Sequence, residues 1–349
     1  MATPAGDNQQ AAVNQGGHGA IRPIGDGSIL AKNAPQGSIE NEFYARIRQG
    51  RYPHLTPVVP ASYTADQVRY RQPQVTEPLD DRTHVYFENI AQGDVKKLDT
   101  KVGDKTSSRR ELMEQHDMSR TGAALKEIKL SIADLATGSS QRGWRVVGGT
   151  DAPESRLRAG MNSQDILRSF SEDPQVWDQL IGKMEAIRAA AQQTDIGFIA
   201  SSVFSVHGNH NGNEVVEAKL IDFAHVIDAD RPLTQTADLA AADGRQNSPE
   251  QSTSTPETGN GAGPTTTAQG SSQTVNWTEM KDKYRSKFLE GMGNLIADAK
   301  AVREEKRQAT VAGAANMRVS AATATAGSSA QPTAVPAVST SSQQVLPRR

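Results

Sequence analysis

Cysteine is absent from this chain of 349 residues, and aromatic residues make up only 5% of it. Without cysteine the protein can form no disulfide, no thiolate zinc site and no cysteine nucleophile, which fits a reducing compartment. Hydrophobic residues account for 36% of the chain, which is below the usual share of a fully globular protein. We therefore expect part of the chain to lie outside the folded core.

An excess of one charge and long apolar runs are also lacking. The 38 Lys and Arg residues nearly balance the 40 Asp and Glu residues, which argues against nucleic-acid binding through bulk charge. No stretch approaches the roughly 18 apolar residues of a membrane helix, and the first residues lack the basic start and apolar run of a signal peptide. We expect a soluble, cytoplasmic monomer that neither binds nucleic acid nor inserts into membranes.

Three segments have too few apolar side chains, or too simple a composition, to form a core. They are residues 1–19, 244–276 and 310–349. Such segments cannot bury enough surface to offset the entropy lost on ordering. The sequence predicts that all three are disordered, the middle one as an insert within a folded unit.

The rest of the chain carries helical and strand patterns in mixed order. Ser38 and Gly50 have the residue types of the two helix ends. The predicted helices are 38–48, one or two within 109–130, one opening at Asp173-Pro174, and 277–309, whose apolar face would pack on the body. The predicted strands are 83–90, 98–103, and 198–207 with 215–224, the last two joined by a loose polar turn. Without a βαβ rhythm, the α+β class is favoured.

Asp222 ends an alternating apolar row in the predicted strand 215–224. Alternation puts Val216, Ala218 and Leu220 on the same face as this carboxylate. A carboxylate at the end of a buried row is costly unless something compensates its charge. Two interpretations stay open: Asp222 binds a hard cation such as Mg²⁺, or it caps the following turn.

Two lysines have acidic partners at suggestive spacing. Asp99 and Lys101 point to the same side of the predicted strand 98–103, so they could hold a polar ligand between them or form an exposed salt bridge. Lys32 lies in a short strand-like segment before a helix that carries Glu40. That order is typical of the phosphate-binding lysine and helix glutamate of kinases.

Several motifs, in one order along the chain, resemble the inositol polyphosphate kinase family, which includes multikinases, trisphosphate kinases and hexakisphosphate kinases. The resemblance covers about residues 19–228 and 280–302. The motifs are ENEFYARI (40–47) with VVP (58–60), YFENI (86–90), LDTKVGDKT (98–106), GWRVVG (143–148), IASSV (199–203), LIDFAHV (220–226) and YRSKFLEGMGNLI (284–296). Two positions depart from the family pattern: Val95 replaces the proline of the signature, and Phe204 replaces a leucine-like residue.

The resemblance implies a two-lobed, kinase-like fold with ATP between the lobes. The N-lobe, an antiparallel sheet plus helix, would span residues 20–92, and a larger C-lobe of sheet and helices would span 93–243. The helix 277–309 would then pack on the C-lobe. The segment 104–142 would build the inositol phosphate pocket.

The family's ATP and Mg²⁺ contacts carry over onto five positions. The resemblance implies that Lys32 contacts the ATP phosphates and that the backbone of Glu88 and Ile90 meets the adenine. Ile221 would also lie at the nucleotide. Asp222 would hold Mg²⁺.

The transfer step carries over onto the signature and the serine motif. The resemblance implies that Asp99 lies near the ribose and the reacting hydroxyl. Lys101 would bridge the inositol phosphate and the transferred phosphoryl group, and Ser201 and Ser202 would shape the site beside them. In the segment 104–142, Lys126 and Lys129 share a helix face that could take phosphates, or that could simply be solvated.

The resemblance thus implies an ATP- and Mg²⁺-dependent kinase acting on an inositol phosphate. The alternative is a weak or inactive member that binds inositol phosphates as a scaffold or sensor. A protein or lipid kinase is disfavoured because no H-R-D or D-F-G loop is present. We interpret His207 and His210 as exposed loop histidines rather than metal ligands, and His225 as structural.

Overall fold

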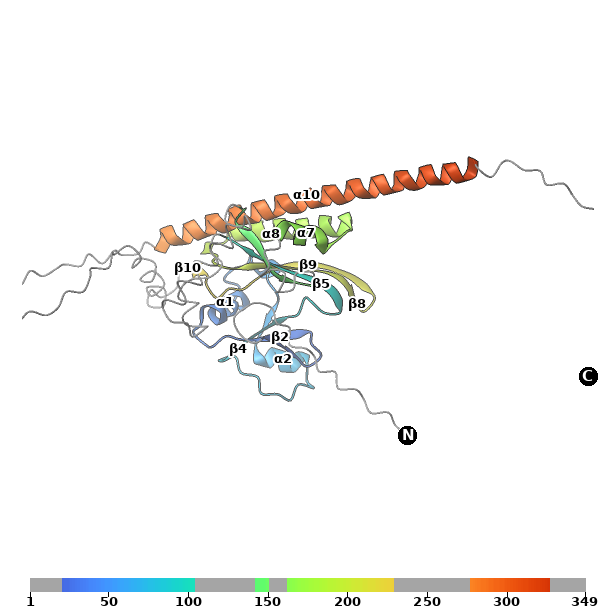
Figure 1. Cartoon of the computed structure of the whole chain (residues 1–349). Helices are drawn as coiled ribbons and strands as arrows, with labels where there is room; N and C mark the ends of the chain where they lie inside the picture. The colour runs from blue at the N-terminus through green and yellow to red at the C-terminus, as the bar shows by residue number, and fades with distance from the viewer. Residues whose placement is uncertain (1–20, 104–141, 151–161, 229–276, 327–349) are drawn as a thin grey trace, which may run out of the picture. The chain divides into compact units, whose positions relative to one another are not determined.

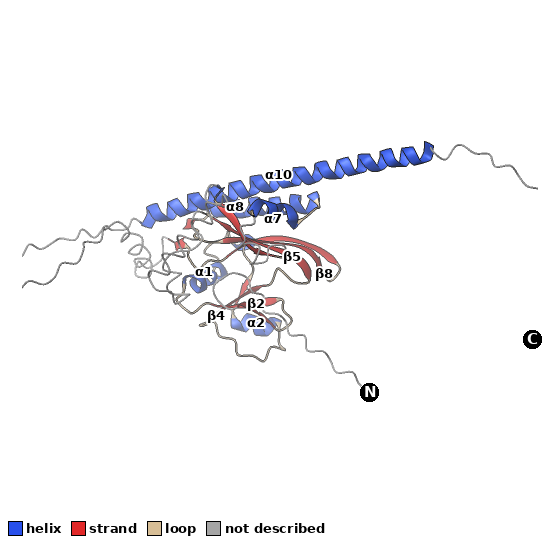
Figure 2. Ribbon diagram, viewed as in Figure 1, coloured by secondary structure: helices blue, strands red, loops and turns tan. Residues whose placement is uncertain are grey.

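The computed structural model describes residues 21–103, 142–150, 162–228 and 277–326 (Figure 1). Helices and antiparallel sheets are mixed in this part of the chain (Figure 2), which confirms the predicted α+β class. The predicted helices within 109–130 lie outside the described residues. So do the predicted disordered segments 1–19 and 244–276.

The first sheet has the strand order β1-β2-β4-β3. Its strands are β1 (Ile21–Ile24), β2 (Ile29–Asn33), β3 (Ser62–Tyr63) and β4 (His84–Glu88), and its helices are α1 (Ile39–Arg48), the 3₁₀ helix η1 (Thr56–Val58) and α2 (Ala65–Arg71). Ser38 caps α1 as predicted, because its side chain accepts a hydrogen bond from the Asn41 N–H. Gly50 has a φ of 74° just after α1 ends. This sheet and helix form the predicted N-terminal half of the fold.

The second sheet has the strand order β6-β5-β8-β9. Its strands are β5 (Asp94–Val102), β6 (Trp144–Gly149), β8 (Ser202–His210) and β9 (Asn213–Ile221), and the short strands β7 (Ile196–Gly197) and β10 (Ile227–Asp228) pair separately. The predicted β8–β9 hairpin is present, but its turn is tight rather than loose. Asn211 and Gly212 have φ values of 53° and 82°, as the central residues of a two-residue hairpin turn require. The strands β8 and β9 therefore extend as far as the turn.

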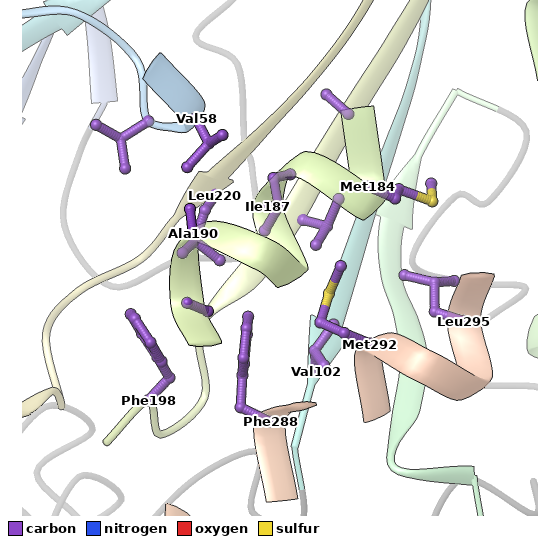
Figure 3. Close-up of a cluster of buried hydrophobic side chains, with 14 of the residues drawn as sticks. Val58, Val102, Met184, Ile187, Ala190, Phe198, Leu220, Phe288, Met292 and Leu295 are labelled. Carbon is purple, nitrogen blue, oxygen red and sulfur yellow. The ribbon is translucent and has the colours of Figure 1, made fainter. Parts of the chain in front are cut away.

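The two faces of this second sheet belong to different hydrophobic clusters. One face carries Leu98, Val102 and Leu220 into the main core, where they meet α8 (Pro174–Gln193) and α10 (Trp277–Ala326). Figure 3 shows side chains of that core, with Phe288 and Met292 of α10 close to α8. The helix α7 (Ser163–Phe170) covers part of the same layer. The opposite face carries a smaller apolar cluster and the candidate site.

The helix α10 has two unlike parts. Its predicted apolar stripe is buried: Tyr284, Phe288, Met292, Leu295, Ala299 and Val302. The chain then divides into two compact units, Met1–Glu304 and Glu305–Arg349. The prediction of disorder from residue 310 onward is wrong as far as Ala326, because the helix continues to that residue. The reason is alanine, which adds little hydrophobicity but has the highest helix propensity.

No helix in the described ranges carries an apolar stretch long enough to cross a membrane.

Candidate active site

Lys32 is buried at the centre of the site, with 4% of its surface exposed. It lies on β2, between β1 and β4. Its Nζ donates to Glu40 Oε1 at 2.8 Å and to Asp222 Oδ1 at 3.1 Å. Burial alone would lower the pKa of this lysine, but the charges of Glu40 and Asp222 outweigh burial and raise the pKa. Lys32 therefore stays charged inside the protein.

Asp222 lies just after β9 and not within it. The predicted strand 215–224 ends at Ile221, and Asp222 has a φ of 63°. Only a few residue types besides glycine adopt this left-handed conformation readily, and Asp is one of them. Its Oδ1 accepts from Lys32, and its Oδ2 accepts from Lys101 at 3.2 Å. Burial would raise the pKa of Asp222, but these two lysines hold it well below its usual range.

Lys101 also contacts the backbone at Ala200, where the predicted strand 198–207 is interrupted. The strand β8 begins only at Ser202, and Ala200 before it has a φ of 54°. The Ala200 carbonyl accepts a hydrogen bond from Lys101 Nζ at 2.7 Å. The Ser201 hydroxyl donates to the Asp222 carbonyl at 3.0 Å. The irregular backbone thus leaves the Ala200 carbonyl oxygen free of the strand ladder, so that it can accept a hydrogen bond from Lys101.

Asp99 and Lys101 share the site face of β5, as alternation predicts. Lys101 pairs with Ser202 of β8, and Ser202 pairs in turn with Ile221 of β9, so these three residues lie side by side across the sheet. Asp99 is buried, with 6% of its surface exposed. Burial raises the pKa of Asp99 to about 6, the negative Asp222 adds to the rise, and Lys101 opposes it.

Two buried polar atoms here lack a partner. Among the described residues, neither Asp99 Oδ1 nor Ser202 Oγ has a hydrogen-bond partner. Buried polar groups are nearly always satisfied in folded proteins. An orphaned carboxylate oxygen beside Lys101 and Asp222 is therefore the kind of atom that a ligand or a metal ion would satisfy.

The segment after β4 borders an apolar cluster on the same sheet face. Ile90 packs there with Ile221, Val95 and Phe204. Asn89 fixes the segment, because its N–H donates to the Ser28 carbonyl at 2.9 Å. An apolar surface next to the charged groups suits a ligand that has both a flat ring and phosphates.

A cavity of about 220 Å³ lies elsewhere, between the chain after α1 and the end of α8. It is lined by Arg51, Tyr52, Pro53, His54, Gln193, Thr194, Asp195 and Asp228. It includes none of the charged residues just described. The chemistry of the site therefore lies in the contact between the two sheets and not in this cavity.

Residues 98–254 match the family model for inositol polyphosphate kinase. This match contains the second half of β5 and all of β8 and β9, and with them Asp99, Lys101 and Asp222. This part of the chain, less than half of its length, is similar to the inositol polyphosphate kinase family. A comparison with curated protein sequences found no match.

Twenty-nine chains of solved structures also match. One is from structural studies and engineering of an inositol phosphate multikinase, with 15% identity and a TM-score of 0.43, covering 76% of this chain and 99% of that one. Another is the S. cerevisiae inositol phosphate multikinase Ipk2 in complex with ADP and Mn²⁺, with 14% identity and a TM-score of 0.40, covering 79% and 99%. The similarity to the family rests on the sequence match over residues 98–254.

The two departures from the family motifs lie in the apolar cluster and remove no charged group. Val95 pairs with Gly208 in the β5–β8 ladder. Valine can donate its N–H to a ladder, whereas proline cannot. Phe204 lies next to Asp99 in the same register. Both substitutions thus preserve the sheet that positions Asp99 and Lys101.

Arg145 is a site residue that the motif analysis missed. It pairs with Lys101 across β5 and β6, so it shares the site face. Its neighbours Trp144 and Val146 are buried in the main core. The signal was present in GWRVVG, because alternation around the two apolar residues points the arginine to the opposite face.

The remaining predicted residues lie away from the site or outside the described residues. Lys126 and Lys129 are not among the described residues. The interpretation of His207 and His210 as loop histidines is wrong, because both lie in β8. His207 is half-buried against α7, with its Nε2 2.6 Å from the Phe170 carbonyl oxygen. His225 lies between Asp222 and β10, and its structural role stays a prediction.

Proposed function

We propose that this chain is a member of the inositol polyphosphate kinase family, and that it is an ATP- and Mg²⁺-dependent kinase that transfers the γ-phosphate of ATP to an inositol phosphate. One observation carries the proposal: Lys32 from the first sheet and Lys101 from the second sheet meet on the single carboxylate of Asp222. A buried and a partly buried ammonium group around one acid form a phosphate site when anionic ligands enter. Phosphoryl transfer depends mainly on positioning and on neutralising charge.

The nucleotide would lie between the two sheets. Lys32 would contact its phosphates, held in place by Glu40 at 2.8 Å. The backbone at Glu88 and Ile90 would meet the adenine, and Ile221 would contribute apolar surface, because Ile90 and Ile221 belong to one cluster. Asp99 would lie near the ribose and the reacting hydroxyl.

The acidic side chains present fit a magnesium ion. Asp222 supplies carboxylate oxygens, the ligands that Mg²⁺ prefers. Both oxygens of Asp222 accept from lysines, and the phosphates of a nucleotide would offer those lysines other acceptors. When bound, Mg²⁺ would neutralise charge on the phosphates.

The acceptor would be held from the β5–β6 side. Lys101 would bridge the inositol phosphate and the phosphoryl group in transfer, and Ser201 and Ser202 would shape the site. Arg145, opposite Lys101 in the ladder, adds a guanidinium suited to phosphate. Lys126 and Lys129 remain proposed contacts of the same substrate.

Asp99 is placed to handle the proton of the attacking hydroxyl. A carboxyl with a pKa of about 6 is mostly ionised at neutral pH and close enough to it to act as a general base. Lys101 on the same strand face would offset the negative charge that develops. These residues therefore provide a base and two cations without any covalent intermediate.

The deciding experiment is incubation of the full chain with ATP, Mg²⁺ and a panel of inositol phosphates, followed by separation of the products. We expect a more highly phosphorylated product from at least one of them, and none from Asp222→Asn. Calorimetry on the same panel separates the alternative. Tight inositol phosphate binding without any product from the wild type would identify a scaffold or sensor.

A further inference from the structure

The helix α1 bears Glu40 in its first turn and Arg46 in its last. The two residues are roughly 9 Å apart along the axis, at 1.5 Å per residue. A helix of this length is only marginally stable alone, so tertiary contacts set its orientation. Whatever holds the end at Arg46 therefore also sets where Glu40 lies relative to Lys32.

The end of α1 is held by a group of three polar residues, which we call the Asp228 cluster: Arg46, Tyr52 and Asp228. Arg46 Nη1 and the Tyr52 hydroxyl both donate to Asp228 Oδ2. Arg46 Nη1 also lies 3.4 Å from the Tyr52 hydroxyl oxygen. The Asp228 side chain is only 11% exposed, so the bonds are partly shielded from water and are stronger than a surface pair.

Asp228 is itself fixed in the second half of the fold. It lies in β10, where it pairs with Ile196 of β7. The same segment begins with Asp222 and Phe223. The ring of Phe223 stacks on Phe43 of α1, with the ring centroids 4.0 Å apart. The segment that carries the proposed metal ligand therefore contacts α1 at its middle and at its end.

We propose that the Asp228 cluster positions α1 so that Glu40 stays paired with Lys32. Asp228 is then a positioning residue, since it acts through Glu40 and touches neither nucleotide nor acceptor. The kinetic part of this proposal rests on the proposed kinase function. Its structural part, the orientation of α1, does not.

The test compares Asp228→Asn with Asp178→Asn. Asp178 of α8 accepts from Arg303 Nη1 at 2.9 Å, so the control also removes the charge of an Arg–Asp pair, but far from α1 in the chain. We expect Asp228→Asn to lower kcat about 10- to 100-fold, as misplaced catalytic groups do, with the KM for the inositol phosphate unchanged. Asp178→Asn should leave kcat unchanged. Tyr52→Phe removes one hydroxyl and serves if Asp228→Asn does not fold.

A double-mutant cycle with Glu40→Gln separates positioning from general stability. If Asp228 acts through Glu40, Asp228→Asn should lower kcat less than about twofold in the Glu40→Gln background, because the two changes then share one effect. A full additional loss would overturn the proposal. So would equal kcat losses in Asp228→Asn and Asp178→Asn.

Hydrogen exchange reports on α1 without any substrate. Asp228→Asn should speed exchange of the amides in the last turns of α1 and leave those of α2 unchanged. Unchanged exchange in α1 would overturn the proposal. A wild type that transfers no phosphate would instead refute the kinase function alone, because the exchange measurement does not depend on activity.

Discussion

Asp222 contributes to the site through both its backbone conformation and its side chain. Its backbone turns out of β9 with a φ of 63°, and its carboxylate lies between the ammonium groups of Lys32 and Lys101. Without that turn, the side chain would follow the alternation of β9. The left-handed conformation thus brings the carboxylate to both lysines.

Asp222→Asn should abolish transfer while leaving the fold nearly intact. Asparagine tolerates the left-handed backbone about as well as aspartate, so the turn survives. The amide is a poor ligand for Mg²⁺ and does not neutralise the lysines, so turnover should fall by orders of magnitude. Steady-state kinetics at saturating Mg²⁺ and a thermal unfolding curve check this. Turnover near that of the wild type would contradict the metal assignment.

Lys101→Ala should lower kcat much more than affinity for the inositol phosphate. Its ammonium lies 3.2 Å from Asp222 and beside Asp99, where the phosphoryl group would carry spread charge in transit. A loss confined to kcat is the signature of an interaction made mainly in the transition state. Lys126→Ala, by contrast, should raise the KM for the inositol phosphate, because a charged hydrogen bond worth about 1–3 kcal/mol of binding free energy is lost. An unchanged kcat in Lys101→Ala would refute its catalytic role.

Asp99→Asn should stabilise the protein at neutral pH while it abolishes activity. The pKa of Asp99 is raised from 3.8 to about 6 in the folded state, so the native protein binds more protons than the unfolded chain between these values. Stability is therefore lost as pH rises through this window, by roughly 2–3 kcal/mol in total. Asparagine carries no charge at any pH, so the Asp99→Asn variant avoids that loss.

The melting temperature of Asp99→Asn should therefore exceed that of the wild type at pH 8, and most of this gain should be gone at pH 4. No gain at pH 8 would contradict the argument that burial raises the pKa of Asp99.

At the scale of elements, the predictable features were those encoded locally. Ser38 caps α1, Asp173 accepts from the Gln175 N–H at the start of α8, and the apolar stripe of α10 is buried. The features that sequence patterns could not give are set by distant partners. Ala200 leaves the strand pattern with a φ of 54°, and its carbonyl accepts a hydrogen bond from Lys101, a residue on another strand.

A matched pair of substitutions on α10 tests where its packing ends. Phe288 is fully buried, whereas Met317 is 74% exposed. Phe288→Ala should destabilise the protein by about 3–5 kcal/mol through lost burial and a cavity. Met317→Ala should change stability by less than about 0.5 kcal/mol, as surface changes usually do. Chemical denaturation measures both, and similar losses would show that residue 317 also packs in solution.

At the scale of the unit Met1–Glu304, the site exists only when both sheets are in place. One hydrophobic cluster contains Leu30 and Phe87 from the first sheet, Leu98 from the second, and Phe288 from α10. Lys32 and Lys101 reach the same carboxylate from different sheets. Motif order in the sequence could predict that these residues belong to one site, but their shared partner follows from how the sheets pack.

The hydrogen bond from the Gly103 N–H to the Gly143 carbonyl, at 2.8 Å, has a consequence for the length of the chain between these residues. It joins the two ends of the excursion 104–142 at the edge of the second sheet, where Gly291 of α10 packs closely against Gly143. Because both ends are already fixed by the fold, the entropy cost of a longer or shorter excursion grows only slowly with its length. Replacing the segment 104–142 by one of another length should therefore leave Lys32, Asp99 and Asp222 where they are.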